Sequence, residues 1–183
     1  VWVLAGQSNM AREFRTYKYL MKELPNLPMN DDIRWFKIAN NTAADQPSKK
    51  VVVEEKFENS WQSSSHKLLP FFSPAGYFFG MHRYKQNNIP LGLIMAARGA
   101  TMINSWVDKK VLENDERYKW TLNPAINKNC KDFKGKPNVK RPSALYNGTI
   151  YPLMPFTIKG VLWYQGESDS RYSDTYKHLF PAM

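Results

Sequence analysis

The sequence predicts an α/β fold with a mostly parallel sheet, and three apolar runs are the main reason. Residues 1–5, 90–97 and 158–164 have the length and the composition of buried strands. A segment with helical features separates the first two runs, and further helical segments lie on either side of the third. The order strand, helix, strand, helix, strand is typical of a parallel sheet with helices on its faces.

The first third of the chain contains two predicted strands separated by polar sequence. Residues 1–5, "VWVLA", form the first, and polar and helix-breaking residues follow to about residue 32. A short edge strand is expected at 33–38. The span 39–69 is rich in Asn, Ser and Lys and is expected to be loop.

A helix is predicted from Pro74 to about residue 85. Ser73 is a favoured N-cap because its hydroxyl accepts a backbone N–H of the first turn, and proline suits that first turn. Asn87 and Asn88 are expected to end the helix. Four residues fall on one face of it: Ala75, Phe78, Phe79 and His82.

The second half of the chain supplies the other two apolar runs and a charged stretch. Residues 90–97, "PLGLIMAA", form the second buried strand, and 108–142 are interpreted as an insertion because they are charged and weakly patterned. A helix and turn at 143–156 are expected to lead into the third strand, 158–164. Residues 173–180 open another helix.

Composition and charge exclude several classes of protein. The formal net charge is +10, but the basic residues are scattered and no nucleic-acid-binding motif accompanies them, so no nucleic-acid partner is expected. No apolar run approaches the roughly 20 residues that span a bilayer, so no membrane partner is expected. Cys130 is the single cysteine and excludes an internal disulfide. No His, Cys and Asp cluster has metal-ligand spacing, so neither a metal nor a cofactor is expected.

Each of the three buried strands runs into a polar turn, and parallel strands bring such turns to one edge of the sheet. Acyl transfer needs a hydroxyl held at a tight turn and N–H donors aimed at the developing oxyanion. Ser8 is the candidate nucleophile, with its own N–H, the N–H of Gly99 and the side-chain amide of Gln165 as donors. Each turn alone is more simply structural, and only the combination favours a serine esterase.

Three motifs extend this interpretation. "GQSNM" at 6–10, "GLIMAARGATMINSW" at 92–106 and "RPSALYNGTIYPLMPFTIKGVLWYQGESD" at 141–169 resemble the sialate O-acetylesterase family. That family belongs to the SGNH, or GDSL-type, hydrolases, with carbohydrate acetylesterases as relatives. The resemblance, weakest at 11–69 and 108–140, implies a single domain over 1–183 with a three-layer α/β/α sandwich, and a metal-independent serine esterase.

The resemblance also assigns roles by position. Ser8 matches the nucleophile, Gly99 the glycine of the second motif, and Gln165 the oxyanion-hole asparagine of the wider superfamily. Three residues of the same motifs are expected to support the site: Gln7, Asn9 and Glu167.

The second motif departs from the family pattern at one position. The family reads Gly-Gly-Thr where this chain has Gly99-Ala100-Thr101. An alanine at position 100 costs little if its φ angle is negative, so Gly99 keeps its expected role.

The family's Asp-x-x-His motif, which supplies the base, is absent from this sequence. Three histidines are candidates for the base. His66 lies in polar loop sequence with no acid partner nearby, and His82 lies beside Phe78 and Phe79 on the predicted helix as a packed or partly exposed residue. His178 follows Asp174 by four residues, the spacing of a solvent-facing helical pair. The fold is therefore expected to be incomplete at its C-terminus, truncated before that block. The catalytic His and Asp are expected beyond Met183, or on a second chain or segment.

The expected substrate is a small molecule or glycan that carries O-acetyl groups, most directly O-acetylated sialic acid. Arg98 is the candidate partner for the sialate carboxylate. Acetyl-xylan, and a catalytically incomplete relative that only binds carbohydrate, remain open alternatives; a lipid or thioester hydrolase is disfavoured by the motifs and by the lack of an apolar lid segment. A secreted or periplasmic location is expected, with the cytoplasm left open.

Overall fold

A computed structural model describes residues 1–58, 60–123 and 138–183, and it divides into two compact units. The first, here called the sheet unit, comprises Val1–Ala39, Val52–Gly99 and Thr157–Tyr164. The second, here called the helical unit, comprises Asn40–Val51, Ala100–Phe156 and Gln165–Met183. Each unit is described by itself.

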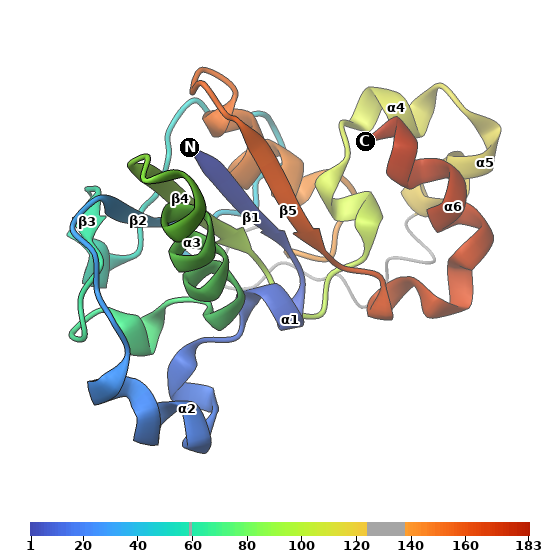
Figure 1. Ribbon diagram of the computed structural model, residues 1–183. Coiled ribbons are helices and arrows are strands. Elements are labelled where there is room, and N and C mark those ends of the chain that lie inside the picture. The colour runs from blue at the N-terminus through green and yellow to red at the C-terminus, as the bar shows by residue number, and fades with distance from the viewer. Residues whose placement is uncertain (59, 124–137) are drawn as a thin grey trace. The chain divides into compact units, whose positions relative to one another are not determined.

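The sheet unit contains a five-stranded sheet in the order β3-β2-β4-β1-β5 (Figure 1). β1 pairs in parallel with β4 and β5, β2 pairs in parallel with β4, and only β3 is antiparallel to its neighbour. The predicted α/β class with a mostly parallel sheet is therefore confirmed. The strands are β1 Trp2–Gly6, β2 Ile33–Lys37, β3 Gln62–Ser63, β4 Leu91–Ala97 and β5 Gly160–Tyr164.

One strand prediction is wrong. The strand expected at 33–38 is not an edge strand, because Arg34 and Trp35 of β2 pair with β3. β3 lies inside the span predicted to be loop, and its two residues, Gln62 and Ser63, are too few and too polar to give a strand signal in the sequence.

The two edges of the sheet differ in chemistry. β3 is short and polar, as edge strands usually are when they are protected from pairing with other chains. β5 reads GVLWY, and its side chains Val161 and Tyr164 are 57% and 50% exposed. Among the strands that the structure describes, β5 pairs only with β1. One edge is therefore blunted, and the other is long and apolar.

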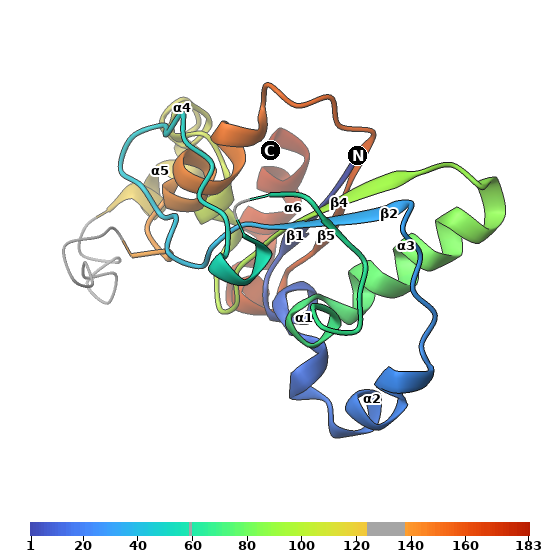
Figure 2. The same ribbon diagram turned by 90° about the vertical axis from the view of Figure 1, so that its left-hand side faces the viewer.

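α3, Pro74–Asn87, begins and ends close to the predicted positions and packs against β2 and β4 (Figure 2). The Ser73 hydroxyl accepts the N–H of Gly76, as expected of an N-cap. Asn88 adopts the left-handed conformation that commonly ends a helix.

The four residues expected on one face of α3 differ in burial. Ala75 and Phe79 pack against the core, whereas Phe78 and His82 are exposed. Gly76, Tyr77 and Gly80 of the same helix are buried. A methyl group built on Gly76 would lie 2.2 Å from Leu4 Cδ1 of β1, and one on Gly80 would lie 2.8 Å from Leu93 Cδ1 of β4. The helix therefore contacts the sheet through glycines. Glycines do not contribute to the pattern of apolar residues from which a buried helix face is predicted.

Aromatic side chains fill the core beside α3. Trp35 stacks on Phe72 with ring centroids 4.7 Å apart, and Phe14 meets Tyr77 edge to face at 5.4 Å. Hydrogen bonds of a buried lysine lie at the edge of this core. Lys37 donates to Glu13 Oε1 at 2.5 Å and to the Phe71 carbonyl at 3.0 Å. The end of β2 is thus fixed to the segment that follows Ser8.

The remaining helices are short. In the sheet unit, α1 spans Ser8–Ala11 and α2 spans Lys18–Glu23; in the helical unit, α4 spans Lys109–Glu113, α5 Glu116–Lys119 and α6 Ser173–Ala182. A π-helical turn covers Tyr146–Ile150. The 3-10 segments are Phe14–Thr16, Leu24–Asn26, Glu55–Phe57, Leu69–Phe71, Ile103–Trp106, Trp120–Leu122, Tyr151–Leu153 and Glu167–Tyr172. In the described ranges no helix is long and apolar enough to cross a membrane.

The predicted insertion, 108–142, is described only in part. Residues 108–123 form α4, α5 and one 3-10 turn, and they bury Leu112 and Tyr118. Residues 124–137, with Cys130, lie outside the described residues. The helices expected within 143–156 and from residue 173 are present as the π-helical turn and α6.

The glycine contact of α3 is testable. Gly76→Ala is expected to lower the free energy of unfolding by about 1–3 kcal/mol, because the methyl group would overlap Leu4. Alanine's intrinsic helix preference of about 1 kcal/mol opposes this loss without cancelling it. Urea denaturation followed by circular dichroism measures the change. Gln86→Ala, on the exposed end of the same helix, is the control, and equal stability of the two variants would refute the close packing.

Candidate active site

The turn between β1 and α1 begins at Gly6, a position where only glycine fits. Its φ angle is +124°, and a Cβ there would lie 2.2 Å from the carbonyl oxygen of Tyr164 in β5. The N–H of Gln7 donates to that same carbonyl at 2.9 Å. β1 therefore ends against β5, and the chain turns away at a position that the backbone alone defines.

Ser8 is the first residue of α1 and is half-buried. Backbone bonds on both sides hold it, because the Gln7 carbonyl accepts the N–H of Met10 at 3.0 Å and the Ser8 carbonyl accepts that of Arg12 at 2.8 Å. Gln7 itself is buried, and Asn9 is half-buried. A serine at a strand-to-helix turn is where a nucleophilic hydroxyl is held out from a sheet edge.

Gly99 lies beside Ser8. A Cβ built on Gly99 would lie 3.8 Å from Ser8 Cβ, which is ordinary contact, and the backbone there is not left-handed. Arg98, half-buried, donates its backbone N–H to the Gly6 carbonyl at 2.9 Å and so extends the pairing of β4 with β1 past the end of the strand. The structure thus brings the first and second polar turns together.

Ala100 does not meet the condition expected of it. Its φ angle is +58°, in the left-handed region, where an L-residue with a Cβ costs about 1–2 kcal/mol relative to the right-handed region. A glycine at this position, as in the family pattern, would avoid the cost. The condition under which alanine would cost little, a negative φ angle, is therefore not met.

Gln165 belongs to the helical unit, whereas Ser8 and Gly99 belong to the sheet unit, so the meeting of all three stays a prediction. Its Nε2 donates to the Thr101 carbonyl at 2.9 Å and also to Asp169 Oδ2. Both hydrogens of the amide are thus engaged. The predicted role of Gln165 as an oxyanion donor requires one of these bonds to be given up.

Asp169 had no role in the sequence prediction, although it ends the third motif. It is 3% exposed and accepts the backbone N–H of Ile103 at 3.0 Å in addition to the Gln165 amide. Burial raises the pKa of its carboxyl group, and the bonds from Gln165 and Ile103 lower it in part. Glu167, the predicted supporting residue nearby, is exposed at the start of a 3-10 helix.

The three histidines lie on different elements. His66 Nε2 lies 2.9 Å from the Leu27 carbonyl, His82 is exposed on α3, and His178 is exposed on α6 of the helical unit. Among the described residues of the sheet unit, neither His66 nor His82 makes a hydrogen bond with the Ser8 hydroxyl, and the position of the catalytic base stays a prediction. Within residues 1–58, 60–123 and 138–183, no group of three His, Cys, Asp or Glu residues could hold a metal ion.

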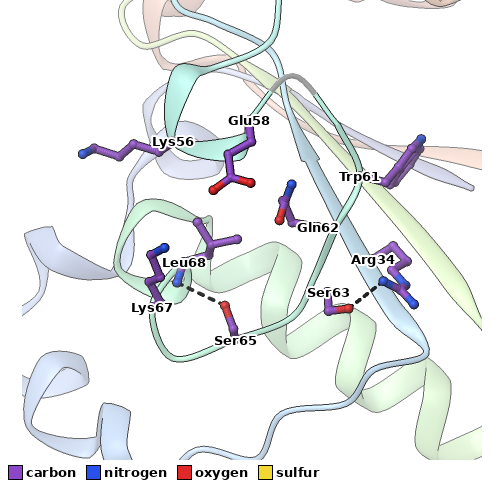
Figure 3. A pocket seen from close by; sticks show the side chains of 9 residues that line it. All are labelled: Arg34, Lys56, Glu58, Trp61, Gln62, Ser63, Ser65, Lys67 and Leu68. Atoms are coloured by element: carbon purple, nitrogen blue, oxygen red, sulfur yellow. Dashed lines mark hydrogen bonds between the residues drawn. The ribbon is translucent and has the colours of Figure 1, made fainter.

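A hollow of about 290 Å³ lies on the β2–β3 side of the sheet unit, apart from the predicted residues (Figure 3). Some of its polar groups are paired with one another: Arg34 donates to the Ser63 hydroxyl at 2.6 Å, and the Leu68 N–H donates to the Ser65 hydroxyl at 3.4 Å. Neither Ser8 nor Gly99 lines it. Its nine lining residues are Arg34, Lys56, Glu58, Trp61, Gln62, Ser63, Ser65, Lys67 and Leu68.

A family model described as carbohydrate esterase, sialic acid-specific acetylesterase, matches residues 1–183. The chain belongs to this family. The family that the three motifs resemble is thereby confirmed.

Three curated relatives, all sialate O-acetylesterases, match this chain along its entire length. The sialate O-acetylesterases of Pongo abelii and Homo sapiens are each 29% identical to it over 185 residues, and that of Mus musculus is 27% identical over 203 residues. Each match covers 100% of this chain but only 34%, 34% and 38% of the respective relative. The chain thus spans about a third of the length of these relatives.

A solved structure shares the fold. A carbohydrate acetylesterase from Xanthomonas citri superimposes with a TM-score of 0.72 at 23% sequence identity. The match covers 96% of this chain and 35% of that one. This esterase-family chain therefore has the fold of a known carbohydrate acetylesterase.

Gly6 and Gly99 form a matched pair for testing the turn that carries Ser8. Gly6→Ala is expected to lower the free energy of unfolding by about 3 kcal/mol or more, or to prevent folding, because its methyl group meets a backbone carbonyl. Gly99→Ala is expected to cost less than about 1 kcal/mol, since there is room for a methyl group. Denaturant unfolding compares the two, and similar losses would contradict the geometry.

Proposed function

We propose that this protein is a serine esterase that removes O-acetyl groups from carbohydrate, with O-acetylated sialic acid as its substrate. The observation that carries the proposal is the position of Ser8, on a turn that Gly6 restricts and in direct proximity to Gly99, where a Cβ would lie 3.8 Å from Ser8 Cβ. Membership of a family of sialic acid-specific acetylesterases over residues 1–183 supports the reaction class.

The proposed reaction has two steps. Ser8 Oγ attacks the acetyl carbonyl while a histidine takes the hydroxyl proton, and the N–H groups of Ser8 and Gly99 stabilise the oxyanion. The intermediate collapses, the sugar hydroxyl leaves with the proton from the histidine, and an acetyl-Ser8 ester remains. Water, deprotonated by the same histidine, then attacks this ester and releases acetate and free Ser8.

Gln165 is proposed as the third oxyanion donor by its place in the family motif. Its amide binds Thr101 and Asp169 in the structure, so the donor role implies that the Thr101 carbonyl is exchanged for the oxyanion as charge develops. Such an exchange would favour the transition state over the ground state, since a neutral acceptor is replaced by a charged one.

We propose that the histidine and aspartate of the triad come from residues other than 1–183, on the same or a second chain. The support is that the sequence holds no Asp-x-x-His motif and that, among the described residues of the sheet unit, neither His66 nor His82 bonds with Ser8. A serine hydroxyl needs such a base near neutral pH.

The sugar specificity is proposed from charge. An O-acetylated sialic acid carries a carboxylate, and Arg98 follows β4 directly before Gly99. The formal net charge of +10 also favours an acidic over a neutral substrate.

A secreted or periplasmic location is proposed because glycans of this kind lie outside cells; recovery of the active protein only from cytoplasm would contradict it.

Ser8→Ala is expected to lower turnover of an aryl acetate by about 10⁴-fold or more, because no acetyl-enzyme can form. Mass spectrometry of rapidly quenched enzyme should find the acetyl-Ser8 ester in the parent protein and no acetyl group at position 8 in the variant. Ser170→Ala, an exposed serine, is the control. Sugar binding without acetate release in the parent protein would instead indicate a binding relative that lacks catalysis.

Replacing His66, His82 and His178 together by alanine is expected to leave the turnover of the active protein within about threefold of the parent value, since exposed side chains contribute little. The rate of aryl acetate hydrolysis at neutral pH measures this. A loss as large as that of Ser8→Ala would place the base among these three residues and overturn the proposal for the triad.

A substrate panel tests the specificity. O-acetylated sialic acid is expected to give a kcat/KM at least about tenfold above that of acetyl-xylooligosaccharides, which have no carboxylate, and Arg98→Ala is expected to abolish the difference through KM. Acetate release is the readout for both substrates. Equal or reversed preference in the parent protein would identify a neutral-polymer esterase.

A further inference from the structure

We propose that Asp169 is a positioning residue: its carboxylate holds the side-chain amide of Gln165 in one orientation against the Thr101 carbonyl. The consequence for catalysis rests on the function proposed above, whereas the orientation itself does not. All the residues involved belong to the helical unit.

Two acceptors dictate how the Gln165 amide lies. Nε2 donates to the Thr101 carbonyl at 2.9 Å and to Asp169 Oδ2. A carbonyl and an ionised carboxylate have no hydrogen to donate, so both must face the nitrogen of the amide and not its oxygen. The chemistry of the neighbours, and not only the fit of the side chain, therefore sets the orientation.

The same carboxylate also fixes the loop that follows Gly99 and Ala100. Asp169 accepts the backbone N–H of Ile103 at 3.0 Å with Oδ2 and at 3.3 Å with Oδ1. Thr101 is fully buried, and its hydroxyl accepts the indole N–H of Trp106 at 3.0 Å. The Thr101 carbonyl that accepts from Gln165 is thus held through the Thr101 side chain and through the bond of Ile103, two residues later.

A merely structural role fits Asp169 poorly. It is 3% exposed, and the two groups among the described residues that bind it, a side-chain amide and a backbone N–H, are neutral. Burying a carboxylate without a cation is costly, and an apolar side chain would fill the same space at less cost. What the carboxylate adds is a pair of acceptors with fixed directions, which is what orienting an amide requires.

Asp169→Asn is the direct test, because asparagine has the same shape but both donates and accepts. Its amide nitrogen can face Gln165, and the glutamine is then free to turn its oxygen toward position 169. We expect the side-chain NH₂ signals of Gln165, assigned by their absence in Gln165→Met, to shift and to exchange faster with solvent in ¹⁵N spectra. We also expect kcat for an aryl acetate to fall about 10²-fold with little change in KM.

Asp174→Asn is the matched control, since it makes the same chemical change at an exposed residue of the same unit. It should leave both the Gln165 signals and kcat unchanged. Unchanged Gln165 signals in Asp169→Asn would overturn the proposal, whatever the activity. If the parent protein proves to have no esterase activity, the proposed function fails, and the NMR comparison still decides the orientation.

A second measurement covers the case in which Asp169→Asn does not fold. The bond from Gln165 lowers the pKa of the buried Asp169 carboxyl group, so Gln165→Met should raise that pKa above its value in the parent protein. The ¹³C signal of the Asp169 carboxyl group, followed against pH in both proteins, gives the comparison. An identical midpoint would overturn the proposal.

Discussion

The contact between Gly6 and the Tyr164 carbonyl is the constraint on which the candidate site depends. It forces β1 to end where β5 ends, it requires a φ angle of +124°, and the next N–H bonds to the same carbonyl. Ser8 follows Gln7 at the start of α1, so its place is set by the packing of the main chain. A side chain held in this way can react without breaking the interactions that position it.

The strands and the long helix could be predicted because their signals are local. Apolar runs predicted β1, β4 and β5 to within a few residues, and Ser73, Pro74 and Asn88 mark α3 by mechanisms that act within one turn. The buried side of α3 could not be predicted, because Gly76 and Gly80 matter only once Leu4 and Leu93 lie against them.

The candidate site shows the same division. Ser8 and Gly99 could be proposed from the ends of two strands, because parallel neighbours place such residues together. The positive φ angle of Ala100 and the two hydrogen bonds of the Gln165 amide depend on tertiary contacts, so no local sequence pattern predicts them. Asp169 was overlooked for a related reason: a carboxylate in a polar motif usually faces solvent, and its burial appears only in three dimensions.

The unequal edges of the sheet have a practical consequence for handling the protein. Among the strands that the structure describes, β5 pairs on one side only, and a five-residue apolar edge strand is a template to which another extended chain can add. The two polar residues of β3 at the opposite edge are a much poorer template. Samples of residues 1–183 alone should therefore self-associate as the concentration rises, starting from β5. The solubility of such samples then depends on β5, the edge strand that pairs with β1, which precedes Ser8.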